Sequence, residues 1–432
     1  MKNVLIISYY WPPMGGGGVQ RWLKTSKYLK RCSDWNPIIL TVNNAEISIY
    51  DESLLDEVKD ITVLRSPIWE PFRLYKMFTG RKNEKINPGF LSTSNKKSFF
   101  DNFSMWIRGN IFIPDAKCFW INPAYKVIKN FLKSKKIDVV VSTGPPHTTH
   151  LIANKIKKKY NIPWLADFRD PWTNIDFYHK LKLSFISDKI HKKLELKVLK
   201  NANVVTTVSK SWAKDLYKIY NREISVINNG FDPEDFDSKN IINLDSNFTI
   251  THAGSINADR NHNIFWETLN ELCISNNDFR ENLEIKLIGP IDFSVRESID
   301  KFNLNQNVTI IDQMPHNFVI KNLISSQLLY LPLNNSPNVN GIIPGKTYEY
   351  MASRRPIICI GNVKGDTAEI LNQTKTGYTC SFDDFDCLKE KILYFYSLYL
   401  KKKLIIKSEN ISIYSRKELA IKFTNIFEKM NS

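Results

Sequence analysis

Short segments rich in apolar and β-branched residues recur along the chain, with stretches of helical periodicity between them. Such segments are typical of the strands of a buried parallel sheet. In the first half they cover residues 4–7, 37–42, 61–64, 138–143, 163–166 and 204–209. In the second half they cover residues 248–254, 283–290, 308–311, 327–333 and 357–360. Two such series predict an α/β protein with two doubly wound Rossmann-like domains that face each other across a cleft.

The boundary between the two series lies in the polar stretch 233–247, which has no hydrophobic period. We therefore place the N-terminal domain at residues 1–235 and the C-terminal domain at residues 245–410. A final helix in residues 411–432 is expected to pack back toward the first domain. Further helices are expected at residues 19–29, 148–160, about 180–199, 264–275 and from 383 onward.

Residues 67–123 interrupt this alternation and are rich in aromatic and basic side chains. Aromatic rings interleaved with cations suit a surface that enters a membrane interface while its charges meet lipid headgroups. The same composition fits the core and rim of an insertion, because most aromatic side chains in proteins are buried. The pattern leaves both interpretations open.

The chain has 60 Lys and Arg against 44 Asp and Glu, a formal net charge of +16. Lysines are densest between residues 155 and 200. Such an excess favours an anionic partner, either nucleic acid, an acidic lipid surface or a phosphorylated substrate, although a solvated basic surface explains it equally well. Since we find no stacking platform or basic recognition helix, nucleic acid is not the expected partner.

The cysteines, at positions 32, 118, 273, 359, 380 and 387, show no metal-ligand spacing. We expect them to be reduced and mostly packed. The apolar start of the chain is too short for a signal peptide, and no window approaches the about 20 apolar residues of a membrane span. We therefore expect a cytoplasmic protein that meets a membrane only peripherally, at the inner face of the cell membrane.

Four consecutive glycines, residues 15–18, lie between a predicted strand and a predicted helix. In this geometry backbone amides can approach a ligand closely. The glycine spacing is not that of the dinucleotide fingerprint. A flexible linker is the alternative interpretation.

Residues 341–352 form a second loop that opens a helix, with Lys346 at its start and Glu349 one turn further on. Loop amides, the helix dipole and Lys346 together suit a phosphate group. Glu349 suits hydroxyl groups, because a carboxylate beside a phosphate would be repelled. A diphosphate with sugar hydroxyls describes a nucleotide sugar, while an ordinary loop–helix junction is the alternative.

Polar side chains follow two neighbouring predicted strands of the first domain. His147 follows one strand, and Arg169 and Asp170 follow the next. The carboxyl ends of neighbouring parallel strands meet at the mouth of a doubly wound sheet, where ligands bind. Alternatively, Arg169 forms a satisfied ion cluster with Asp167 and Asp170, and His147 is a structural residue beside prolines.

These motifs make the sequence resemble the retaining glycosyltransferases of family 4, which have the two-domain GT-B architecture. The similarity covers nearly the whole chain. Residues 17–20 match the family's amino-terminal glycine loop, and residues 228–232 resemble the segment before its second domain. Residues 254–260 resemble its phosphate-binding loop, and residues 346–353 with Pro356 resemble its donor-binding helix.

The resemblance implies transfer of a sugar from a nucleoside diphosphate sugar to a hydroxyl of a glycan or lipid-linked acceptor, with retained anomeric configuration, in bacterial surface-polysaccharide assembly. It implies a front-side substitution in which the leaving phosphate takes the acceptor's proton, without a metal or a cofactor. The expected partners are this donor, this acceptor and an anionic membrane surface. The expected site residues are Arg260, Lys346 and Asp170 as catalytic residues; Gly17, Gly18, Gly254, Ser255, Gly289, Gly345, Thr347 and Glu349 on the donor; and Gln20, His147 and Arg169 on the acceptor or sugar side.

The sequence departs from the family pattern at two positions. Many members have a glutamate eight positions before the residue that matches Glu349, and this chain has Gly341 there. Many members also have a histidine where this chain has Arg169. Contacts to the transferred sugar must then come from other groups, such as loop amides, Asp170 or His147.

Three other functions fit parts of the pattern. A nucleotide-sugar epimerase and a glycan phosphorylase share the architecture, and the phosphorylase would reveal itself by the absorbance of a lysine-bound pyridoxal cofactor. A non-catalytic module that binds nucleotides or nucleic acid through its basic face belongs to a different class. Its binding to oligonucleotides would fall steeply with salt.

Overall fold

The computed structural model describes residues 1–45, 49–70, 106–107, 109–176, 178–237 and 243–431. They form two units, each built on its own parallel sheet. Among the described residues, the first unit contains those up to Asn229 together with 416–431, and the second contains 230–415. Two doubly wound α/β domains are therefore present, as the strand pattern predicts.

The first sheet has seven strands in the order β3-β2-β1-β4-β5-β6-β7. Its central strands are apolar and buried on both faces because helices cover both sides. The strands are β1 (Lys2–Ile7), β2 (Trp35–Val42), β3 (Thr62–Ser66), β4 (Val139–Gly144), β5 (Trp164–Phe168), β6 (Val204–Thr207) and β7 (Ser225–Val226).

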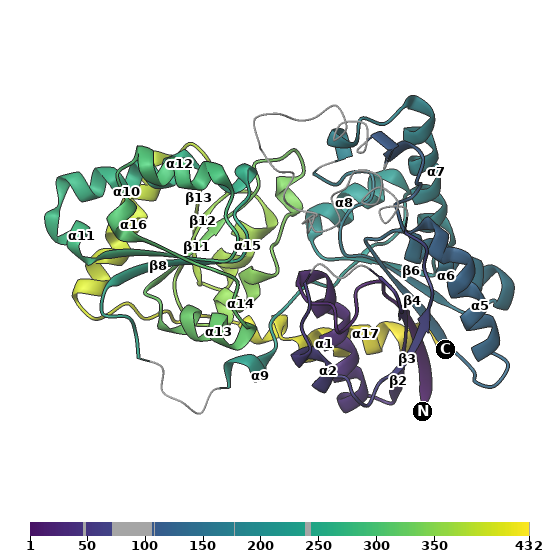
Figure 1. The fold of residues 1–432 in the computed structure, drawn as a ribbon. Coiled ribbons are helices and arrows are strands. Elements are labelled where there is room, and N and C mark those ends of the chain that lie inside the picture. Colours follow the sequence, from purple (N-terminus) through teal and green to yellow (C-terminus); the bar gives the residue numbers. More distant parts are fainter. Residues whose placement is uncertain (46–48, 71–105, 108, 177, 238–242, 432) are drawn as a thin grey trace. The chain divides into compact units, whose positions relative to one another are not determined.

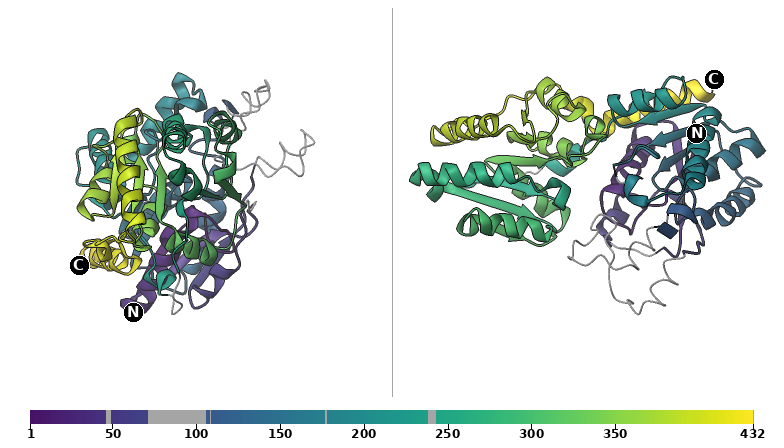
Figure 2. Two further views of the ribbon diagram at one scale, coloured as in Figure 1. Left: turned by 90° about the vertical axis from the view of Figure 1, so that its left-hand side faces the viewer. Right: turned by 90° about the horizontal axis from the view of Figure 1, so that it is seen from above.

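Two groups of helices cover this sheet (Figures 1 and 2). On one face α17 packs along α1, and on the other α6 packs against α5 and α7. The helices are α1 (Gly17–Cys32), α2 (Ser53–Asp56), α5 (Ile121–Phe131), α6 (Thr148–Tyr160), α7 (Phe185–Asn201), α8 (Lys210–Ile219) and α17 (Arg416–Asn431).

The second sheet has six strands in the order β10-β9-β8-β11-β12-β13. The strands are β8 (Phe248–Ala253), β9 (Leu283–Ile288), β10 (Val308–Ile311), β11 (Leu328–Pro332), β12 (Ile357–Ile360) and β13 (Gly377–Cys380). The helices are α9 (Pro233–Phe236), α10 (Asn263–Ser275), α11 (Asn277–Asn282), α12 (Phe293–Lys301), α13 (His316–Ser325), α14 (Lys346–Ala352), α15 (Asp366–Gln373) and α16 (Phe385–Leu400).

Each sheet has a switch point where the winding direction reverses. In the first sheet it lies between β1 and β4, and in the second between β8 and β11, because these pairs are neighbours in the sheet but not in the chain. Ligands of doubly wound sheets bind at the carboxyl ends of the strands at such points. The glycine loop 15–18 follows β1, and Gly254 follows β8. Both sequence motifs therefore lie at switch points.

Several local expectations differ from the structure. The basic helix begins at Phe185 rather than near residue 180. Lys182 has a left-handed φ of 49°, which a helix cannot contain, and Ser184 then caps the helix. The stretch taken as a featureless linker contains α9, which Asp232 caps and Pro233 starts.

The cysteine prediction is wrong for one pair. Cys380 ends β13 and Cys387 lies in the first turn of α16, and the turn between them brings their Cα atoms to 5.9 Å in a disulfide. The other four cysteines are free, as expected.

Most of the aromatic and basic stretch 67–123 lies outside the described residues. The end of this stretch belongs to a regular element, since Ile121–Phe131 form the amphipathic helix α5. No helix in the described part of the chain is both long enough and apolar enough to cross a membrane.

Candidate active site

Two glycines shape the carboxyl edge of the second sheet. Gly254, after β8, and Gly289, after β9, each have a φ of +113°, which L-residues with side chains rarely adopt. A Cβ on Gly254 would lie 2.5 Å from Nζ of Lys346, and a Cβ on Gly289 would lie 3.3 Å from the backbone of Gly254. The two loops and Lys346 are therefore packed so closely that neither glycine position has room for a side chain.

His252 holds the amino group of Lys346 over Gly254. The imidazole is 1% exposed, and its Nδ1–H donates to the carbonyl oxygen of Tyr330 at 2.9 Å. Its Nε2 is then a lone-pair acceptor, and Nζ of Lys346 donates to it at 3.1 Å. Burial, followed by the charge of Lys346, lowers the pKa of His252 well below its usual value, so the ring stays neutral and can accept this bond.

Arg260 brings a second cation to the same edge. It ends a short 3-10 turn, Ala258–Arg260. Its Nε donates to Oδ1 of Asn334 at 2.7 Å, and its Nη1 donates to the carbonyl oxygen of Ser255 at 3.4 Å. These two bonds anchor the guanidinium between the loops that follow β8 and β11.

The charges at this edge interact. Burial lowers the pKa of Lys346 well below its usual value, the guanidinium of Arg260 lowers it further, and the carboxylate of Glu349 raises it. Arg260, Lys346 and Glu349 are thus close enough to influence one another. Two neighbouring cations repel each other, and an anion bound beside both would relieve that repulsion.

Glu349 lies one turn into α14 and is half-buried. Its Oε1 is 3.1 Å from Nε2 of His316, and Nδ1 of the same ring is 4.0 Å from Oδ2 of Asp235. Because a carboxylate can accept several hydrogen bonds, this contact leaves Glu349 with acceptor capacity for hydroxyl groups.

The other predicted donor residues of α14 differ in access. Gly345 is exposed, and a Cβ there would meet nothing within 4 Å. Thr347 is fully buried, its amide donates to the carbonyl oxygen of Pro344, and its hydroxyl has no partner in the described structure. Thr347 therefore packs beneath the site, without reaching its surface.

In the first unit, Arg169 ties the glycine loop to the end of β5. Its Nη1 donates to the carbonyl oxygen of Gly18 at 2.9 Å, and its Nε and Nη2 each lie 3.2 Å from Oδ2 of Asp170. A Cβ on Gly18 would lie 3.1 Å from the ring of Tyr10 and 3.3 Å from Arg169, whereas Gly17 has open space around it. Gln20 follows in the first turn of α1 and is half-buried.

The expected ion cluster around Arg169 is only half correct. Asp167 lies on the strand and points away, into a buried network in which Arg21 donates two hydrogen bonds of 2.8 and 2.9 Å to its carboxylate. Trp22, Thr143 and Thr206 donate three more bonds to it. Asp167 lies within β5 and Arg169 follows its end, and the two residues have different partners: Asp167 bonds to Arg21 in the core, and Arg169 to Asp170 at the edge.

His147 is buried beneath this edge. Its ring stacks on Trp172 with centroids 4.6 Å apart, and its Nδ1 has no hydrogen-bond partner in the described structure. Burial, and then the neighbouring His150 and Arg169, lower its pKa well below the usual value. His147 is therefore a neutral side chain that supports the surface formed by Arg169 and Asp170.

Three residues of this site, His252, His316 and Asn334, were not predicted from the sequence. His252 is an ionisable residue near the carboxyl end of the strand 248–253, and that position is the signal that could have identified it. His316 and Asn334 lie in segments far from their partners in sequence, so no local pattern marks them.

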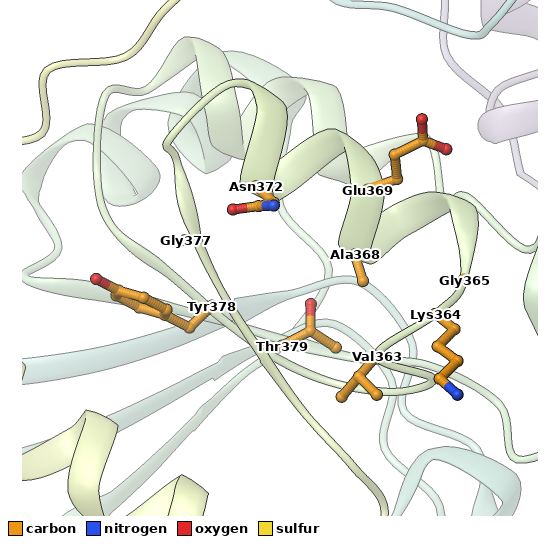
Figure 3. Close-up of a pocket in the computed structure, with 9 residues that line it drawn as sticks. All are labelled: Val363, Lys364, Gly365, Ala368, Glu369, Asn372, Gly377, Tyr378 and Thr379. Carbon is orange, nitrogen blue, oxygen red and sulfur yellow. The ribbon is translucent and has the colours of Figure 1, made fainter.

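A hollow of about 410 Å³ lies elsewhere in the second unit, between α15 and the edge strand β13. Figure 3 shows that the charged ends of two of its lining residues, Lys364 and Glu369, point in different directions, so they do not converge on a ligand. We therefore assign the site to the switch point and not to this hollow. No cluster of three or more His, Cys, Asp or Glu side chains in the described residues could hold a metal ion.

Comparisons with known families identify both halves of the chain. The profile of Glycosyltransferase Family 4 matches residues 96–235, and that of Glycosyl transferases group 1 matches residues 247–397. A search of curated protein sequences finds no match for this chain.

Solved structures match over the whole length. Sucrose-phosphate synthase of Thermosynechococcus elongatus has a TM-score of 0.66 at 13% identity, covering 100% of this chain and 99% of its own. Anabaena HepE in complex with UDP and glucose has a TM-score of 0.62 at 12% identity, covering 99% and 100%. WaaG, a glycosyltransferase involved in lipopolysaccharide biosynthesis, has a TM-score of 0.55 at 12% identity, covering 99% and 98%.

These structural likenesses show the fold, and both matching profiles are of glycosyltransferases. One glycosyltransferase profile matches residues 96–235 and another matches residues 247–397. The protein is a glycosyltransferase with the GT-B architecture.

Proposed function

We propose that this enzyme transfers a sugar from a nucleoside diphosphate sugar to a hydroxyl group of a glycan or a lipid-linked acceptor, with retained anomeric configuration. The observation that carries the proposal is the proximity of Arg260 and Lys346 at the switch point of the second sheet, where the guanidinium of Arg260 lowers the pKa of the Lys346 amino group. A diphosphate offers the two negative groups that such a pair of cations binds.

The chemical step places new charge on the same diphosphate. When the bond between the sugar and the diphosphate breaks, the leaving oxygen becomes more negative. Preorganised cations that face this oxygen stabilise the transition state more than the ground state. His252 and Asn334 hold the two cations in place before the donor arrives, so little reorganisation is needed during the reaction.

The nucleoside end of the donor would lie against Glu349. Its carboxylate is one helical turn beyond Lys346 and can accept hydrogen bonds from both ribose hydroxyls. UDP is the first nucleotide to test, because HepE, which shares the fold, binds UDP and glucose.

Retention would follow from a front-side substitution in which the leaving phosphate takes the acceptor's proton. A double displacement needs a protein carboxylate as nucleophile, and Glu349, the carboxylate that acts on the pKa of Lys346, is assigned here to the nucleoside. Proton NMR of the first product formed tests this point, since the coupling constant of the anomeric proton distinguishes retention from inversion.

The first unit would present the acceptor. Arg169 and Asp170 form a polar pair at the carboxyl edge of its sheet, where an acceptor hydroxyl can be held. WaaG acts in lipopolysaccharide biosynthesis and shares the fold. We therefore place this enzyme in bacterial cell-surface polysaccharide assembly, working at the cytoplasmic side of the membrane.

We also propose that the reaction needs no metal and no organic cofactor, because Arg260 and Lys346 supply the positive charge that a divalent cation would otherwise bring to the diphosphate. Activity should then be the same with EDTA and with Mg²⁺. A large gain with Mg²⁺ would contradict this.

A thermal-shift screen of UDP, GDP and ADP sugars tests the donor assignment. A ligand that binds only the folded state raises the melting temperature in a concentration-dependent way. One nucleotide class should stabilise the protein, and Arg260→Ala should abolish the effect. If none of them shifts the melting temperature of the intact protein, or if Arg260→Ala keeps the full shift, the proposed donor site is wrong.

A further inference from the structure

Helix α7 presents an unusual surface on the first unit. Its two opening turns expose large apolar side chains: Phe185 is 80% exposed, Ile186 69% and Ile190 40%. The helical period of 3.6 residues brings exposed lysines to the same side. The outer face of α7 is the side formed by Phe185, Ile186, Lys189, Ile190, Lys193 and Lys197.

The carboxylates of α7 are turned away from this face. Asp188 pairs with Lys192 at 2.8 Å and accepts a hydrogen bond from the hydroxyl of Tyr178 at 2.9 Å. Glu195 is 1% exposed and accepts hydrogen bonds from Thr173. The charge on the outer face of α7 is therefore positive throughout.

A neighbouring segment extends the apolar part. The amide of Ser184 donates to Oδ1 of Asn110 at 2.6 Å, and the hydroxyl of Ser187 donates to the carbonyl oxygen of Asn110 at 3.2 Å. The next residue, Ile111, is 59% exposed. Residues 109–111 are thus bonded to the start of α7 and add a further apolar side chain beside it.

We propose that the outer face of α7 docks on an anionic lipid bilayer. Apolar side chains at a helix start gain stability when they enter the acyl boundary of a membrane, and lysines on the same face meet anionic headgroups. Single exposed apolar residues are common on soluble proteins. Here three of them share one face with three lysines and no carboxylate, which is the charge pattern that an acidic membrane surface complements.

This inference rests on the proposed function, because docking on a membrane would bring the enzyme to a lipid-linked acceptor. α7 follows β5, so its first turn lies near the carboxyl edge of the first sheet, the edge that carries Arg169. The indole Nε1–H of Trp172 donates to Nδ1 of His191 in α7 at 3.1 Å, and Trp172 stacks on His147. A bilayer that touches the start of α7 would therefore lie close to the acceptor edge, where a lipid-linked acceptor presents its head group.

Vesicle cosedimentation with the intact protein tests the proposal. At physiological salt, the wild type should bind vesicles of phosphatidylcholine with 30% phosphatidylglycerol. The double variant Phe185→Asp/Ile186→Asp should bind them at least roughly tenfold more weakly. A triple change of Lys189, Lys193 and Lys197 to Gln should weaken binding by on the order of 100-fold, since each lysine near an anionic surface contributes roughly fivefold.

Matched controls test whether binding depends on the outer face of α7 or only on the total charge and exposed apolar surface of the protein. Ile274 is 74% exposed on α10 of the second unit, and Ile274→Asp should bind vesicles like the wild type. A triple change of the exposed Lys401, Lys402 and Lys403 to Gln removes the same charge and should have little effect. Equal losses in the α7 and control triples would overturn the proposal.

Two other results would also overturn it. One is wild-type binding that is no stronger with phosphatidylglycerol than with phosphatidylcholine alone. The other is a concentration-dependent dimer that Phe185→Asp/Ile186→Asp abolishes without vesicle binding, because the face would then be an interface between copies of the chain. The nucleotide thermal shift of each variant is measured in parallel. A retained shift shows that the variant is folded, and a failure of the donor site leaves the vesicle result unaffected.

Discussion

The neighbours of Lys346 fix the position of its amino group and at the same time disfavour its protonated form. His252 accepts a hydrogen bond from its ammonium group, and Gly254 leaves the space in which that group lies. Burial and Arg260 lower its pKa. A cation held under such conditions is suited to an anionic ligand, because the ligand restores the charged form.

Binding of UDP should therefore raise the pKa of Lys346 and be accompanied by uptake of protons at alkaline pH. Calorimetry in buffers of different ionisation enthalpy measures this uptake. Lys346→Met should lose it and should lower kcat/KM by on the order of 100-fold or more. Lys364→Met, in the hollow of Figure 3, removes an exposed lysine and should change neither quantity. Full proton uptake in Lys346→Met would contradict the assignment.

Glu195 should make stability depend on pH. Burial raises its pKa to about 7, from 4.5 in the unfolded chain. Between these values the folded state keeps a proton that the unfolded state has lost, so the free energy of unfolding falls as pH rises toward 7 and then levels off. The loss amounts to about 3 kcal/mol, since one pKa unit corresponds to about 1.4 kcal/mol.

Glu195→Gln removes this titration while keeping an acceptor for Thr173. Urea unfolding of the wild type and the variant between pH 4.5 and 8 measures the effect. The variant should gain up to about 3 kcal/mol relative to the wild type as pH rises to 7. A difference that does not change with pH would show that Glu195 is ionised in the folded protein.

At the scale of elements, α17 completes the core of the first unit although it lies at the end of the chain. Phe423 packs against Trp22 with ring centroids 4.7 Å apart, and Phe427 packs against Trp35 at 5.3 Å. All four rings are buried in one hydrophobic cluster. The helix thereby covers α1, the element that carries Gly18 and Gln20.

Phe427→Ala should lower the free energy of unfolding by about 3–5 kcal/mol, because it leaves a cavity among these rings. Ile421→Ala on the exposed side of α17 should change it by no more than about 0.5 kcal/mol. Urea denaturation of both variants gives the comparison. Equal effects would mean that α17 does not form part of the core in solution.

At the scale of the whole molecule, the two units have separate hydrophobic cores. The clusters of the first unit and of the second share no residue. Proteins with more than one such core often unfold in more than one step. Since Arg260, Lys346 and Glu349 all belong to the second unit, a donor should stabilise that unit directly.

Differential scanning calorimetry should then show two transitions. UDP, or the nucleotide found by the thermal-shift screen, should raise one of them. Phe427→Ala should lower the other. A single transition that both changes move equally would show that the units unfold together.

Much of the architecture was predictable because buried parallel strands are short and rich in apolar and β-branched residues. The strands expected at residues 4–7, 248–254 and 357–360 are present as β1, β8 and β12. β13 was missed, because Gly377–Cys380 is short and lies at the edge of its sheet. Edge strands carry a weaker apolar signal, since one side faces solvent.

The candidate site was also predictable only in part. Glycine loops at strand ends are visible in a sequence, because only glycine tolerates the backbone of residues such as Gly254. Their partners are not visible. The bond from Lys346 to His252 joins residues 94 positions apart, and the contact of Glu349 with His316 joins residues 33 apart.

The amino-acid sequence by itself determined the two parallel sheets and the glycine-lined strand ends, because burial and backbone conformation impose local patterns on a chain. Only the tertiary structure decided which distant groups the charged side chains meet: Asp167 with Arg21 in the core, Arg169 with the carbonyl oxygen of Gly18, and Lys346 with His252. The reason is that these contacts join residues far apart in the chain, and the order of strands in each sheet that brings them together leaves no local pattern.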